Sequence, residues 1–500
     1  MIIVYLFSKT KYIMLPSKVG LPAEVQPSLS YSLPASARSY AVRVQPSNLS
    51  SVSSATLSCG TTAGALASDL AFPNTNIIFD IPTSQSPSTF LDCRMTCINF
   101  KATTTIVTQG VTGTGSNSAA NLRGGGASFF DIMTIYGGDG AVLEQINEYG
   151  IVSDTITQLM YNQSQRDAVA LPYGFLSSTN NENQGHSIES LTGAFNAAAS
   201  VAAHSYSIPI MSGLIGSAAD SFLNIGRTSK LQLVFQTSSV LPYTIVNAAT
   251  GTAQTFTVTL SDFSIGLEYV DVGMDALSMI DETLIDGQYY SHGTTYKTSS
   301  TALPATSGSV SLLSGLRGSS LKSLITRFQE NALTTAGGVN GKYDSKNPNL
   351  SSFSYSIGGV RYPQASINTL TQPALAYTEV LKAVGSFNSA LYNPSIIPAQ
   401  YCVLSAGGVA QALTNTNGTD YYYAVSATAN SKQAGFFVGQ NTEKSAKHGI
   451  FSGLDVTSAP IFNELTIQNT LTNAHNVYNI GMFDVVYIHD VRSGLIQARM

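Results

Sequence analysis

The side chains best suited to acid–base, nucleophilic or metal chemistry do not form a known catalytic pattern in this 500-residue chain. No histidine stands in the H-E-x-x-H spacing that places two zinc ligands on one helix face. No G-x-S-x-G segment encodes the sharp turn that exposes a nucleophilic serine. We therefore predict no catalytic residue and a protein that is not an enzyme. The histidines are His186, His204, His292, His448, His475 and His489.

One glycine-rich segment, residues 337–343 (GGVNGKY), partly resembles a phosphate-binding loop. The first glycine of that motif is missing at its required spacing, and Tyr343 stands where a metal-binding hydroxyl residue is needed. We interpret it as an ordinary loop and predict no nucleotide cofactor.

Two acidic residues and two cysteines also deserve a chemical interpretation. Asp484 and Asp490 lie on one predicted strand, whereas a hydrolytic carboxylate pair would need partners from separate strands, so we expect both on a solvated face.

Cys93 and Cys97 fall on one face of a predicted strand, where they are poorly placed to bridge. We interpret them as buried small side chains and predict no metal site. Four cysteines make no disulfide framework and fit reduced thiols inside a cell.

The composition points to a chain that associates with itself. Charged residues make up 11% of the sequence, well below the roughly 25% of ordinary soluble domains. So little charge protects a surface poorly against association, and we expect much of this surface to be buried against other copies. A secreted β-protein with a hydroxyl-rich surface is the alternative. The net charge is −5 without a basic block, which predicts no specific nucleic-acid binding.

The first residues, MIIVYLFSKTKYIMLP, are apolar but interrupted by two lysines. The apolar run is too short to span a bilayer, and it lacks the basic start and small-residue cleavage site of a secretory signal. We predict an N-terminal arm and lead-in, residues 1–39, that docks on a neighbour or a membrane surface. A simple edge strand is the alternative.

A long alternating strand is predicted near the middle of the chain and another at its end. Within residues 256–271, apolar side chains such as Val258, Leu260 and Ile265 alternate with polar ones, the period of a half-buried strand. Residues 482–491 (MFDVVYIHDV) repeat this layout. A short helix, residues 274–280, follows the first strand with Asp271 as its N-cap, so we expect a hinge at residues 271–287.

The two halves follow the same order of predicted elements. Each has strands, then one helix with apolar residues three and four apart (142–160, starting at Asp139–Gly140 and with a break at Gly150, and 374–387), then loops and closing strands. Each helix starts about 90 residues before a later strand, a spacing compatible with duplication. Short strands separated by Gly, Pro and Asn favour sandwiches. We predict an all-β chain with two eight-stranded sandwiches at residues 40–272 and 288–500, joined by a linker helix at 273–287.

Several shorter segments carry more specific predictions. Residues 91–107 predict one long β-rich run, and residues 353–362 predict a strand that stops at Pro363. Two polar stretches, residues 174–203 and 410–432, the latter including Tyr421–Tyr423, are expected to form outer loops or contacts between subunits.

Six stretches, taken in order, resemble the double jelly-roll major capsid proteins of tailless icosahedral DNA viruses, the lineage of adenovirus, virophages and Polinton-like viruses. Their order and spacing carry the resemblance, which covers about half of the chain; the region before residue 40 matches nothing in the family. The stretches are VLEQINEYGIVSDTITQLMY, HSYSIPIMSGLIG, FLNIGRTSKLQLVFQ, FTVTLSDFSIGLEYVDV, SYSIGGVRYP and the C-terminal FNELTIQNTLTNAHNVYNIGMFDVVYIHDVRSGLIQARM.

The resemblance implies two tandem jelly rolls, each with one short inserted helix and long surface loops. It also implies a homotrimer that forms a pseudo-hexameric capsomer and tiles an icosahedral shell. Expected partners are further copies of the chain, minor capsid and penton proteins, and an internal membrane reached by the N-terminal arm; the location is the virion, assembled inside the host cell. The alternatives are a secreted β-sandwich adhesin or carbohydrate-binding module, and a β-sandwich hydrolase without a recognisable site. The chain has no Trp, which disfavours the adhesin.

Overall fold

A computed structural model gives the fold of the chain. It describes residues 37–48, 55–60, 75–108, 118–122, 124–174, 186–187, 200–219, 222–238, 243–247, 254–282, 284, 286–330, 343, 345–369, 371–387, 394–396, 401, 435–443, 452–471 and 473–499. Residues 1–36 of the predicted N-terminal arm 1–39, most of the predicted outer loop 174–203 and the whole of 410–432 with Tyr421–Tyr423 lie outside these residues. No helix in the described ranges is long and apolar enough to cross a membrane.

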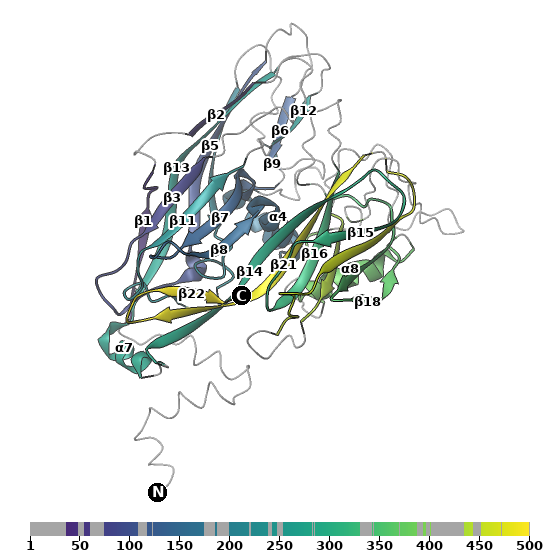
Figure 1. Cartoon of the computed structure of the whole chain (residues 1–500). Helices are drawn as coiled ribbons and strands as arrows, with labels where there is room; N and C mark the ends of the chain where they lie inside the picture. The colour runs from purple at the N-terminus through teal and green to yellow at the C-terminus, as the bar shows by residue number, and fades with distance from the viewer. Residues whose placement is uncertain are drawn as a thin grey trace.

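The first half of the chain forms two antiparallel sheets and a small additional sheet (Figure 1). One sheet has the order β1 (Arg38–Val44), β13 (Gln254–Asp271), β5 (Cys97–Thr108), β10 (Ser200–Pro209), with β2 (Ala55–Gly60) and β4 (Thr89–Leu91) also paired to β13. The other has the order β3 (Asn76–Ile81), β11 (Leu231–Thr237), β7 (Phe130–Tyr136), β8 (Val142–Asn147). The small sheet joins β12 (Tyr243–Asn247), β6 (Ser118–Leu122) and β9 (His186–Ser187).

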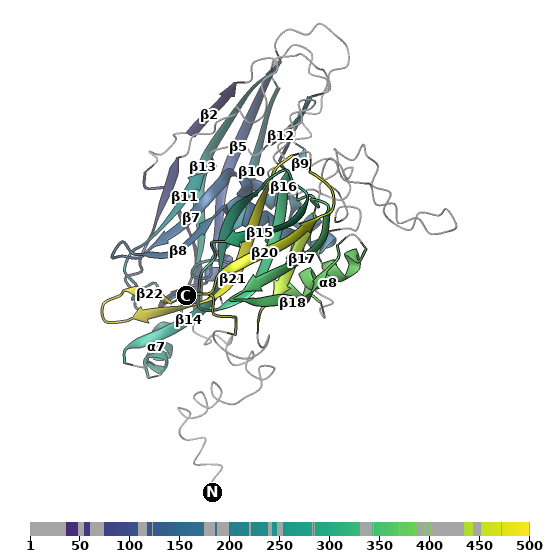
Figure 2. The ribbon, with the colours of Figure 1, turned by 45° about the vertical axis from the view of Figure 1, so that its right-hand side comes forward.

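The second half forms another pair of antiparallel sheets, which Figure 2 shows in front of the first pair. One has the order β14 (Gln288–Leu303), β21 (His475–Asp490), β16 (Leu321–Glu330), β19 (Phe437–Asn441), with β22 (Ile496–Arg499) paired to β21. The other has the order β15 (Gly308–Ser314), β20 (Ile461–Ile467), β17 (Leu350–Ile357), β18 (Val360–Ile367).

The two halves repeat each other strand by strand. Within each half, the main strands numbered by their order of appearance form one sheet ordered 1-8-3-6 and a second ordered 2-7-4-5. This interleaving of two antiparallel sheets is the jelly-roll arrangement. The predicted all-β fold of two tandem eight-stranded jelly rolls is therefore confirmed.

Alternation along the strands builds the core. On β11, Leu231, Leu233 and Phe235 are buried and the residues between them are half-buried, as expected for a strand with one face on the core. Phe100 on β5 stacks on Phe263 with ring centroids 5.7 Å apart. Further aromatic rings, those of Phe129, Phe130 and Tyr206, surround Phe100 in the first sandwich.

The predicted helix 142–160 is partly wrong, because its first six residues are strand β8. Leu143 and Ile146 are buried there beside β7. The pairing of β8 with β7 shifts register within this strand, so two residues three positions apart can both face the core. Asp139–Gly140, expected to start the helix, is the turn between β7 and β8. The helix α4 spans Tyr149–Met160, so Gly150 does not interrupt it.

The other two predicted helices are present with shifted ends. The helix α7 spans Gly273–Asp281, and its N-cap position is Val272, although the Asp271 carboxylate does accept the Gly273 N–H at 3.1 Å. An ion pair between Asp281 and Arg227, with an Nη2–Oδ2 distance of 2.8 Å, ties α7 to the first sandwich. The helix α8 spans Pro373–Ala383 and ends before the predicted residue 387.

Three local predictions need correction. A short 3₁₀ helix, η2 (Cys93–Met95), interrupts the run 91–107, so Cys93 and Cys97 do not share a strand face; both are free thiols. The strand predicted at 353–362 is a hairpin of β17 and β18 joined at Gly358–Gly359, and Pro363 lies inside β18. An edge strand tolerates proline because one row of its backbone groups has no strand partner.

Replacing Phe100 by alanine should lower the free energy of unfolding by about 3–5 kcal/mol, because the surrounding rings would lose contacts and leave a cavity. The measurement is denaturant unfolding followed by intrinsic fluorescence. Leu313→Ala is the control, since Leu313 is 52% exposed and its truncation should cost far less. Equal losses for both variants would contradict this description of the core.

Candidate functional site: the buried interface between the two sandwiches

The helix α4 lies between the two sandwiches, to the right of the first one in Figure 1. All its residues from Tyr149 to Leu159 are buried, among them Asp154, Thr155 and Gln158. A helix buried on every side normally has apolar residues throughout. Polar side chains in such a place require hydrogen-bonding partners, and the second sandwich provides them.

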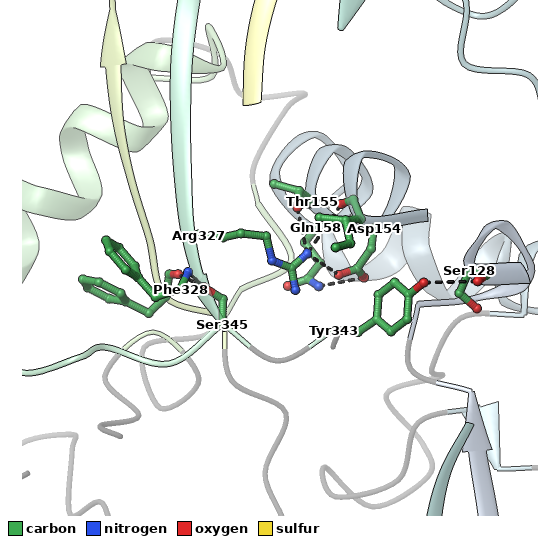
Figure 3. A network of polar contacts seen from close by, with 10 residues as sticks. Ser128, Asp154, Thr155, Gln158, Arg327, Phe328, Tyr343 and Ser345 are labelled. Carbon is green, nitrogen blue, oxygen red and sulfur yellow. Dashed lines mark hydrogen bonds and ion pairs between the residues drawn. The ribbon is translucent and has the colours of Figure 1, made fainter. Parts of the chain in front are cut away.

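The central contact is an ion pair between Asp154 on α4 and Arg327 on β16 of the second sandwich (Figure 3). The Arg327 Nη1 lies 3.3 Å from the Asp154 Oδ2 and donates to the Thr155 hydroxyl at 3.0 Å. The other Asp154 oxygen accepts from the Gln158 amide at 2.8 Å. Both charged side chains are 0% exposed. Burial raises the pKa of Asp154, and the positive charge of Arg327 opposes that rise.

Tyr343 makes a second contact across this interface (Figure 3). Its hydroxyl donates to the Ser128 carbonyl at 3.1 Å, and the residue is 1% exposed. A Cβ at Gly150 would lie 2.8 Å from that hydroxyl, so the glycine provides room for the tyrosine. Tyr343 is thus an interface residue, and the interpretation of 337–343 as an ordinary loop missed this; residues 337–342 lie outside the described part of the chain.

A buried carboxyl group forms a third contact. Glu144 on β8 accepts hydrogen bonds from the Ser212 hydroxyl and the Gly213 N–H, and Thr295 and Tyr487 of the second sandwich lie beside its carboxyl group. Burial raises the pKa of Glu144. Nearby, the Thr294 N–H donates to the Ala218 carbonyl at 3.0 Å, which joins the backbones of the two sandwiches directly.

A fourth contact lies near α7, where β14 begins and β21 ends (Figure 1). The ring of Tyr289 stacks on His489 with centroids 4.4 Å apart and planes 3° from parallel. The Tyr289 hydroxyl accepts the Asn224 N–H at 3.1 Å, and the Ser229 N–H donates to the Gly494 carbonyl at 2.7 Å. The C-terminal strands are therefore bonded to a loop of the first sandwich.

The prediction that the chain has no catalytic residues and no metal site stays a prediction. Across the described residues, no three side chains of His, Cys, Asp or Glu lie close enough to hold a metal ion. The Asp484 side chain is 16% exposed, so the expectation of a solvated face was wrong for it. Asp490 instead accepts the Arg492 N–H and the Ser493 hydroxyl in a turn.

The histidines that the structure places most deeply are neutral core residues. Burial lowers the pKa of His475 to about 4 and that of His489 to about 3. His489 bonds through its Nε2 to the Ser291 hydroxyl at 2.7 Å. His448 and the side chain of His186 are outside the described part of the structure.

Sequence reasoning missed Arg327 and Asp154. The available signal was a charge inside an apolar stretch: Arg327 interrupts the strand LITRF, and Asp154 lies within the apolar periodicity of the helix. Such charges indicate buried partners, but no local pattern pairs residues so far apart.

No protein-family model matches the chain, and no curated protein sequence is similar to it. Among solved structures, its fold is similar to a chain of the Sputnik virophage, with a TM-score of 0.54 and 12% identity over 96% of this chain and 93% of that one. It is also similar to the mavirus major capsid protein, with a TM-score of 0.50 and 9% identity over 94% of this chain and 91% of that one. These likenesses span both sandwiches and confirm the double jelly-roll fold.

Removing one member of the buried ion pair should be costly. We expect Arg327→Met or Asp154→Leu alone to lower the free energy of unfolding by about 3–5 kcal/mol, because each leaves an unpaired buried charge. The double variant should be more stable than either single one. The measurement is a double-mutant cycle from denaturant unfolding.

The exposed pair Arg361–Glu464 offers a matched control, since its side chains are 53% and 33% exposed. Its loss should cost about 0–1 kcal/mol. Additive effects at Arg327 and Asp154, with no coupling, would contradict the proposed role of the pair.

Acid should destabilise the fold through the buried histidines. The pKa values of His475 and His489 are lower in the folded chain than the ordinary 6.5, so the unfolded chain binds more protons between pH 6.5 and about 4. The contribution of the two neutral histidines to the free energy of unfolding is fully present above pH 6.5. It falls as the pH drops through this window, by about 1.4 kcal/mol per pH unit for each histidine. Melting temperatures of the wild type and of His489→Gln across this range test it; the variant should show the shallower decline, and parallel curves would refute this cause.

Proposed function

We propose that this chain is the major capsid protein of a tailless icosahedral DNA virus, a structural protein without enzymatic activity. The observation that carries the proposal is the duplicated jelly roll, which matches a virophage chain and the mavirus major capsid protein over nearly their whole lengths. A secreted adhesin or carbohydrate-binding module is not favoured, because neither needs two identical topologies fused in one chain.

Three copies of the chain would form a pseudo-hexameric capsomer. Each copy supplies two lobes of the same topology, so three copies around an axis place six similar lobes in a ring. The second sandwich of one copy would then meet the first sandwich of the next, a head-to-tail contact that closes into a ring. The contact inside the chain, built on α4 and Arg327, serves as its template.

The helix α8 is our candidate for the contact between copies. It follows the fifth main strand of the second sandwich, as α4 does in the first. The second sandwich covers α4, whereas Leu375 in α8 and Phe387, which follows the end of α8 at Ala383, are 43% and 51% exposed. Large exposed apolar side chains favour an interface.

The remaining parts of the chain take their roles from this arrangement. We assign residues 1–39 to an arm that contacts a neighbour or an internal membrane, 40–272 and 288–500 to the two jelly rolls, and 273–287 to the linker helix. The outer partners are further trimers in the shell, minor capsid proteins and penton proteins. The protein works in the virion and assembles inside the host cell, with no cofactor and no specific nucleic-acid contact.

Light scattering after size exclusion should give a native mass of three times 52.7 kDa. Leu375→Glu together with Phe387→Glu should shift the protein toward the monomer, because burying the new charges would oppose the contact. Met274→Glu on α7, where the methionine is 61% exposed, is the control and should leave the trimer intact. A wild type that stays monomeric at micromolar concentration would overturn the trimer.

A further inference from the structure

One lysine in the second sandwich lies between two carboxylates in a largely enclosed site. The Lys322 Nζ is 3.3 Å from the Asp484 Oδ1 and 3.8 Å from the Glu443 Oε1. The three side chains are 28%, 16% and 17% exposed. Lys322 is on β16, Asp484 is on the adjacent β21, and Glu443 follows β19 on the other side of β16.

The strand register brings these groups together. Between Leu321 and Ser323 the pairing of β16 with β21 shifts by one residue, so Lys322 is the extra residue of a bulge. Bulges re-aim a side chain relative to the regular alternation of a strand. The Thr442 N–H donates to the Lys322 carbonyl at 2.9 Å, which holds the bulge beside Glu443.

The carboxyl group of Asp484 is held on its other oxygen. Its Oδ2 accepts the Ser320 hydroxyl at 2.7 Å and the Ser452 N–H at 3.2 Å. The Ser452 hydroxyl donates to Glu443 at 2.6 Å, and the Gly453 N–H orients Ser320 at 2.9 Å. One amine, one carboxyl carbon, a second carboxylate and two hydrogen-bond donors therefore converge.

We propose that Lys322 and Asp484 condense without another enzyme into an isopeptide bond, with Glu443 as the proton carrier. This inference does not depend on the proposed capsid function. An amine and a carboxyl group that the fold holds side by side do not pay the entropy cost of bringing two separate molecules together, so their condensation is faster than a bimolecular one. Donors aimed at an oxygen that becomes negative stabilise the tetrahedral intermediate, and Ser320 with the Ser452 N–H is placed to do so.

The reaction balances without an oxidant or another reactant. Glu443 takes one proton from the Lys322 ammonium and passes it to the Asp484 Oδ1, and the freed Nζ lone pair attacks the carbon of the resulting carboxylic acid. The C–N bond forms while Oδ2 carries the negative charge. Nζ then gives a second proton to Glu443, which passes it to Oδ1, and Oδ1 leaves as water when its bond to carbon breaks. The products are one amide, with one hydrogen left on nitrogen, and one water.

Peptide mass spectrometry tests the bond directly. We expect trypsin to yield a branched peptide in which residues 318–327 are joined to residues 448–492, one water lighter than the sum of the two, because a modified Lys322 is no longer cleaved. The intact chain should be lighter by the same water. A peptide that ends at unmodified Lys322, together with an intact mass that equals the sequence mass, would overturn the proposal.

Three variants separate the chemistry from a simple ion pair. Lys322→Arg should restore the sequence mass, and Glu443→Gln should slow the formation of the branched peptide while both reacting groups remain. Lys346→Arg is the matched control: Lys346 pairs with Glu330 at 2.9 Å and its side chain is 19% exposed, and this change should leave the branched peptide in place. Branching that persists in Glu443→Gln at the wild-type rate would remove Glu443 from the mechanism.

Discussion

The relative placement of the two sandwiches depends on the buried ion pair of Arg327 and Asp154. Neither side chain contacts solvent, so each charge is tolerable only while the other is present. A buried pair contributes little net stability compared with well-packed apolar residues, yet it penalises any arrangement that separates its members. We infer that its role is orientation: it fixes the second sandwich against α4, while Tyr343 and Glu144 secure the same interface at two further places.

The general fold could be predicted because its signals are local. Alternation on strands such as β13, and the repeated order of elements in the two halves, depend on residues close in sequence. The helix prediction failed where apolar spacing fits both a helix and a strand. Leu143 and Ile146 suit either element, and only pairing with β7 selects the strand. The interface residues could not be predicted, since Arg327 and Asp154 meet across 173 positions and no local pattern encodes that contact.

Low charge and a duplicated fold both suit a chain that packs against copies of itself. Edge strands and half-exposed apolar residues such as Leu375 are a hazard for a monomer, but they suit a subunit whose sides are covered by identical neighbours. In the trimer that we propose, one kind of contact between adjacent jelly rolls would serve both within the chain and between copies. The interface inside the chain would then set the angle at which each copy presents its outer faces.

We propose that the two jelly rolls of each copy act as one rigid unit in a ring of six similar lobes. Single-particle electron cryomicroscopy of the purified protein tests this most directly. We expect a particle with threefold symmetry and a six-lobed, nearly hexagonal outline, in which both lobes of each chain keep the arrangement set by Arg327 and Asp154. Separate two-lobed particles, or lobes at variable angles to each other, would contradict it.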